Sequence, residues 1–92
     1  MPEEVLFESE VRQRRTEVAD YLRTVAEKLE AGGSLTLSAG DQSVTLDPRE
    51  TVDFEVKAEE ETEAGSPPER SVEFELEWRE GKGEPAGDLD IS

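Results

Sequence analysis

The chain lacks cysteine and histidine altogether, and it has only five aromatic residues, one of them a tryptophan. Without cysteine there is no disulfide framework, no thiol nucleophile and no cysteine-ligated metal site. Without histidine, the usual zinc sites and histidine general-base chemistry are excluded as well. We therefore expect a protein that works without a metal or an organic cofactor.

Long apolar runs are also missing. No stretch approaches the roughly 18 consecutive apolar residues that a membrane-spanning helix needs. The first eight residues, MPEEVLFE, are acidic where a secretory signal peptide would be basic. These features predict a soluble cytoplasmic protein with no membrane partner.

What the chain has in excess is negative charge, with 25 acidic against 10 basic residues and a net charge of -15. In dilute buffer so many carboxylates repel one another and weaken the compact state. At molar salt the Debye length falls to about 3 Å and most of this repulsion disappears. We interpret the composition as that of a halophilic cytoplasmic protein; the alternative is an ordinary acidic protein with acidic ends.

The strand pattern is clearest over residues 71–80, where apolar and charged side chains alternate without a break as far as the tryptophan. Strand side chains point alternately to opposite faces, so this pattern predicts a strand with one apolar face. Residues 51–59 repeat the alternation, and residues 4–11 show it less regularly. Two shorter strands, residues 34–38 and 42–46, are expected on either side of a tight Gly-Asp turn.

A single helix is predicted over residues 17–31, because its apolar side chains recur at helical spacing. Thr16 is placed to cap its first turn. Gly32 and Gly33 are expected to end it, since glycine readily adopts the left-handed conformation found at helix ends.

These elements predict an α+β fold in the order β-α-β-β-β-β. The single helix would pack on one face of an antiparallel sheet, and the other face of the sheet would be wet and acidic. Like charges on neighbouring strands disfavour pairing, so such a sheet should tighten as salt is added. We expect residues 1–80 to form one domain and residues 81–92 to be a disordered, acidic, glycine-rich tail.

Three segments resemble the amphi-Trp domain family: EVLFE at residues 4–8, EVADYLRTVAEKLEAG at 17–32 and VEFELEW at 72–78. The resemblance covers roughly residues 3–80. It implies a small domain with an amphipathic last strand that ends in tryptophan, in a family that occurs in halophiles among other prokaryotes. The motifs contain no catalytic signature, so the resemblance transfers no functional residues.

Trp78, at the end of the last apolar face, is open to two interpretations. It is either the edge of the core or, together with Arg79, an exposed anchor for a partner. The basic cluster Arg12, Arg14 and Arg15 is equally ambiguous. These arginines either pair with acidic strands or contact phosphate, although the net charge and a salty cytosol both oppose phosphate binding.

The remaining acidic clusters do not suggest catalysis or metal binding. Residues 59–63 lack the alternating acidic spacing and central glycine of a calcium loop. The strand glutamates look equivalent and exposed, whereas acid and base catalysis needs two carboxyls in different environments. We therefore expect a small non-enzymatic interaction domain that binds a protein partner or itself. The alternative is an accessory nucleic-acid-binding protein that uses Arg12, Arg14 and Arg15.

Overall fold

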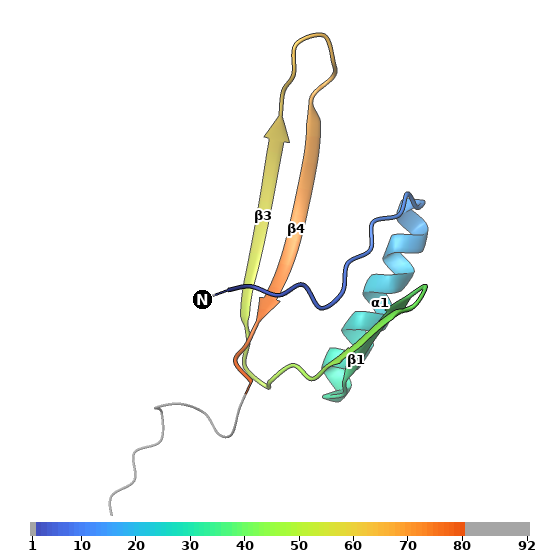
Figure 1. Ribbon diagram of the computed structural model, residues 1–92, viewed down its shortest axis with the longest axis vertical. Helices are drawn as coiled ribbons and strands as arrows, with labels where there is room; N and C mark the ends of the chain where they lie inside the picture. Colours follow the sequence, from blue (N-terminus) through green and yellow to red (C-terminus); the bar gives the residue numbers. More distant parts are fainter. Residues whose placement is uncertain (1, 81–92) are drawn as a thin grey trace, which may run out of the picture. The chain divides into compact units, whose positions relative to one another are not determined.

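The computed structural model of this 92-residue chain describes residues 2–80. The predicted tail, residues 81–92, lies outside the described residues. The elements are α1 (Arg15–Ala31), β1 (Leu35–Ala39), β2 (Gln42–Leu46), β3 (Asp53–Glu61) and β4 (Glu69–Glu77) (Figure 1). The predicted α+β class is confirmed, but the four strands form two separate antiparallel hairpins, β1–β2 and β3–β4. The chain divides into two compact units, residues 1–50 and 51–92, and each is described by itself.

Helix α1 begins two residues earlier than predicted, and its N-cap is Arg14. The Glu17 carboxylate accepts a hydrogen bond from the Arg14 backbone N–H at 3.1 Å, and the Glu17 N–H donates to the Arg14 carbonyl at 2.9 Å. A glutamate three residues after the cap is well placed for this return bond. The prediction that Thr16 caps the helix is therefore wrong, and Thr16 lies within the first turn.

The predicted end of the helix at Ala31 is confirmed. Gly32 adopts a left-handed conformation with φ 74°, and its N–H donates to the Leu29 carbonyl at 3.2 Å. The Gly33 N–H donates to the Lys28 carbonyl at 3.0 Å. These bonds satisfy carbonyls that the helix itself leaves without a partner.

The β1–β2 hairpin follows the predicted pattern closely. Leu35 lies opposite Leu46 and Ala39 opposite Gln42, so the turn contains only Gly40 and an aspartate. Gly40 has φ 59°, a conformation that glycine adopts without strain. The apolar side chains of both strands are half-buried, and α1 contacts β1 (Figure 1). On the helix only Ala19 and Val25 are half-buried, whereas Leu22 stays 52% exposed.

The predicted first strand, residues 4–11, is absent from the structure, where residues 2–14 contain neither helix nor strand. The side-chain amide of Gln42 takes the place of a strand partner. Its Oε1 accepts from the Glu8 N–H at 3.3 Å, and its Nε2 donates to the Glu8 carbonyl at 3.0 Å. Only Phe7 in this segment is half-buried, while Val5 is 73% exposed. One side chain thus occupies both backbone groups that Glu8 would offer to a neighbouring strand.

The β3–β4 hairpin pairs from Asp53 opposite Glu77 to Glu61 opposite Glu69. Both strands lie nearer the turn than predicted, so the connecting loop is shorter than residues 60–70. The extra pairing includes an ion pair between Arg70 Nε and Glu60 Oε1 at 2.7 Å. The hairpin is a two-stranded sheet, and the predicted single sheet with the helix on one face is not confirmed.

No side chain among residues 2–80 is fully buried. The most apolar part of β3–β4 is more than half exposed, including Phe54 at 62% and Phe74 at 56%. Over the same residues, no helix is long and apolar enough to cross a membrane.

Candidate interaction surfaces

One face of the β3–β4 hairpin, the apolar face, carries apolar side chains from both strands. Val56 lies directly opposite Phe74, and the rings of Phe54 and Phe74 stack across the strands with centroids 6.3 Å apart and planes 4° apart. Towards the turn this face ends at the ion pair between Glu60 and Arg70. Its members are Phe54, Val56, Ala58, Val72, Phe74 and Leu76. The face is a continuous apolar strip of the kind that proteins cover.

The opposite face, the acidic face, sets carboxylates against one another. Asp53 lies opposite Glu77 and Glu55 opposite Glu75. The carboxylate of Glu77, then desolvation, and then the other nearby carboxylates raise the pKa of Glu75 above its usual range, while Lys57 lowers it. This face concentrates negative charge as predicted, and among residues 2–80 no group of acidic side chains is arranged to hold a metal ion.

Trp78 directly follows β4 and is half-buried, so it is neither a core residue nor a fully exposed one. Its indole Nε1–H donates to the Glu80 carboxylate at 2.7 Å. Arg79, between them in sequence, is exposed. The bond to Glu80 was not anticipated from the strand alternation. It holds the indole N–H, the group that a partner would otherwise use.

The three arginines Arg12, Arg14 and Arg15 lie at the start of α1, and all are exposed. They lie near one another because they are neighbours in the sequence. Arg14 serves as the N-cap through its backbone. Within the described residues, none of their guanidinium groups forms an ion pair. The acidic strands β3 and β4 belong to the other unit, so the interpretation in which these arginines pair with acidic strands stays a prediction.

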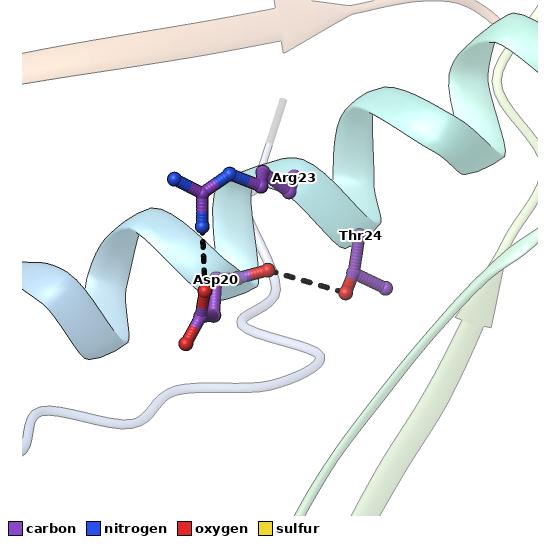
Figure 2. Close-up of polar contacts among 3 residues, drawn as sticks. All are labelled: Asp20, Arg23 and Thr24. Atoms are coloured by element: carbon purple, nitrogen blue, oxygen red, sulfur yellow. Dashed lines mark hydrogen bonds and ion pairs between the residues drawn. The ribbon is translucent and has the colours of Figure 1, made fainter.

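Arg23, two helical turns further along α1, does not add a free positive charge to this cluster. Its Nη1 pairs with the Asp20 carboxylate at 2.6 Å, and the Thr24 hydroxyl donates to the Asp20 carbonyl at 3.2 Å (Figure 2). The pair is three residues apart along the helix, where side chains are neighbours. Arg23 is thus neutralised locally.

The pair formed by Gln42 and Glu8 was missed by the sequence reasoning. Periodicity carries no signal for it, because the bond joins a side chain next to a turn to the backbone of a residue 34 positions earlier. It gives the N-terminal segment its defined contact with the β1–β2 hairpin.

Comparison with known proteins identifies a family for this chain. The family model of the Amphi-Trp domain matches residues 1–92. Neither the curated proteins nor the solved structures contain a match to the chain. Because the family match covers the whole sequence, the chain belongs to the Amphi-Trp domain family.

Proposed function

We propose that the protein is a small non-enzymatic interaction domain that binds a protein partner, or a second copy of itself, through a strand edge or the end of β4. The observation that carries this proposal is the open state of both sheets. Each has only two strands, so in the described chain every strand has one edge whose backbone groups lack a strand partner. Such edges accept an added strand.

Trp78 and Arg79 supply side chains at one such place. Tryptophan and arginine are the residue types most enriched at the centres of interfaces. The half-buried ring of Trp78 offers an apolar surface, although its N–H is already bonded to Glu80. A partner would therefore recognise the ring face more than the indole N–H.

The proposed fold of the complete domain is a single antiparallel sheet that joins the β1–β2 and β3–β4 hairpins, with the helix covering one face. It is supported by apolar side chains left exposed in both units. Leu22 of α1 is 52% exposed and Phe74 of β4 is 56% exposed. An isolated two-stranded hairpin is at best marginally stable in water, so its apolar face needs cover. Nuclear Overhauser effects between the side chains of Leu22 and Phe74 would be expected in this fold, and their absence would count against it.

We place this activity in a high-salt cytoplasm on the strength of the net charge of -15. At molar salt the repulsion between two such acidic molecules is largely screened. Association through apolar and backbone contacts survives these conditions, whereas association through exposed ion pairs is weakened.

The proposal is tested by purifying tagged protein at molar potassium chloride and comparing three chains. Wild-type protein is expected to retain a stoichiometric protein partner or to elute as a dimer. Trp78→Ala should lose this association while keeping its circular dichroism spectrum. Tyr21→Ala is the matched control, because Tyr21 is another exposed aromatic residue, at 61%, and lies on the helix. Retention of the partner by a folded Trp78→Ala protein would refute the Trp78 version of the proposal.

The second candidate function is accessory nucleic-acid binding through Arg12, Arg14 and Arg15. The specific observation in its favour is that all three arginines are exposed at the start of α1. Guanidinium binds phosphate oxygens in two-pronged fashion. Binding driven by phosphate contacts weakens steeply with salt, which opposes this function in a salty cytosol. Chemical shifts at the three arginines should move when an oligonucleotide is added at molar salt, and unchanged shifts would rule the function out.

A further inference from the structure

The pairing register of β3–β4 places acid opposite acid three times. The pairs are Asp53 with Glu77, Glu55 with Glu75, and Glu61 with Glu69. Because strand side chains alternate between faces, all three pairs lie on the acidic face. Directly opposed like charges disfavour pairing of the two strands. The register of this hairpin therefore contains repulsive pairs that destabilise it.

The attractive pairs do not protect the whole hairpin equally. Lys57 lies opposite Glu73 at the middle of the hairpin, and Glu60 pairs with Arg70 nearer the turn. Two acid–acid pairs, those of Asp53 and Glu55, are instead at the open end, away from the turn. Separation of the strands is thus favoured to start at the open end.

The β1–β2 hairpin provides a reference within the same molecule. Its strands contain no charged residue. Thr36 and Thr45 lie opposite each other with their hydroxyl oxygens hydrogen-bonded at 3.0 Å. Because no like charges face each other between these strands, added salt has no repulsion to screen in this hairpin.

We propose that β3–β4 is an ionic-strength switch, whose strands pair at high salt and separate from the open end at low salt, while β1–β2 does not respond. Opposed side chains in a sheet are about 5 Å apart at Cβ and diagonal ones about 7–8 Å. These separations fall below the Debye length of about 10 Å at 0.1 M salt and exceed the length of about 3 Å at 1 M. Salt in this range therefore removes most of the repulsion.

The switch also controls the apolar face. Phe54 and Phe74 belong to different strands, and their ring contact at 6.3 Å exists only while the strands are paired. The pKa of Glu75 is raised first by Glu77 on the same strand and then by desolvation, and Glu55 across the hairpin adds a smaller contribution that depends on pairing. The inference does not depend on the proposed partner, because it concerns pairing within one chain.

The test is residue-resolved amide hydrogen exchange of the full chain in potassium chloride from about 0.02 to 3 M, a range that spans strong and negligible screening. Protection is calculated against denatured protein at the same salt concentration. Repulsion in the three acid–acid pairs together should change the equilibrium constant for strand opening by roughly tenfold. Protection of the β3–β4 amides should rise by about this factor, with most of the rise below about 0.5 M, while protection of β1–β2 stays constant.

Two variants with the same change in net charge sharpen the test. Glu75→Gln removes one acid–acid pair and should raise β3–β4 protection at low salt and flatten its salt dependence. Glu27→Gln, on the exposed surface of α1, should leave both unchanged. The proposal is overturned if both hairpins respond in parallel, if protection rises steadily up to the highest salt, if salt has no effect, or if the two variants behave alike.

Discussion

Replacement of Phe74 by alanine tests whether the apolar face of β3–β4 is exposed or covered by the helix. Phe74 is 56% exposed in the described hairpin, so less than half of its side chain is shielded. Full burial of a phenylalanine is worth about 1.5–3 kcal/mol, and the hairpin alone thus supplies about 1 kcal/mol. The stacked ring of Phe54 adds about 1 kcal/mol. The hairpin by itself therefore predicts a loss of about 2 kcal/mol in the free energy of unfolding.

If the helix covers the apolar face, as in the proposed single sheet, Phe74→Ala creates a cavity and the loss grows to about 3–5 kcal/mol. We expect this larger value in urea denaturation at molar potassium chloride, urea being chosen because it adds no ions. Val11→Ala is the control, since Val11 is 64% exposed and lies outside every element, and it should change stability by less than about 0.5 kcal/mol.

A loss of only about 2 kcal/mol would refute the single-sheet proposal and leave the hairpin as described. A double-mutant cycle with Phe54→Ala tests the hairpin itself, because the two rings touch across the strands. A coupling energy near zero between the two substitutions would show that the register is wrong.

Three further perturbations follow from single contacts. Gln42→Ala should expose the Glu8 amide to rapid hydrogen exchange, because that N–H donates to the Gln42 side chain at 3.3 Å. The control Gln13→Ala should leave this exchange unchanged. Equal exchange in both variants would contradict the contact. Gly40→Val should lower the free energy of unfolding in urea by about 1–2 kcal/mol through backbone strain at φ 59°. Open space surrounds the glycine, so no steric clash adds to this loss. An unchanged midpoint would contradict this turn. Because the pKa of Glu75 is raised in the folded state, the paired hairpin binds its proton more tightly, and stability should rise as the pH falls from neutral towards the usual carboxylate range. Thermal unfolding should show a smaller gain on acidification for Glu75→Gln, and the reasoning fails if wild type and variant gain equally.

The parts that could be predicted from the sequence are those governed by local chemistry. Gly32 ends the helix as expected because only a residue tolerant of positive φ fits there easily. The bounds of β2 and a turn at Gly40 were predicted correctly for the same kind of reason, although Ala39, predicted to lie in the turn, is the last residue of β1. The alternation in β3 and β4 predicted which side chains share a face.

The errors arose where a side chain replaced an expected backbone interaction. The helix starts at Arg15 because the Glu17 carboxylate returns to the cap, which makes the hydroxyl of Thr16 unnecessary. The segment over residues 4–11 has a strand-like pattern, but Gln42 occupies the backbone groups of Glu8. Alternation shows which residues share a face, and it does not show which strand lies alongside. For this reason the single sheet stays a prediction, since β1–β2 and β3–β4 are separate hairpins of different units.

The candidate site was predictable to a similar degree. The alternation predicted Trp78 on the apolar face of the last strand, whereas the structure ends β4 at Glu77 and bonds the indole N–H to Glu80. For Arg12, Arg14 and Arg15, the sequence showed only a cluster of like charges. Their exposure at the start of α1 became clear only from the structure.

Affinity purification of the tagged protein from its native cytosol at molar potassium chloride, with and without nuclease, distinguishes the two proposed functions most directly. Mass spectrometry then identifies what co-purifies and in what ratio. An interaction domain predicts a stoichiometric protein partner, or a second copy of the chain, that survives nuclease treatment and is lost from Trp78→Ala. Co-purifying nucleic acid, with every protein partner lost after nuclease, would contradict the account and transfer the function to Arg12, Arg14 and Arg15.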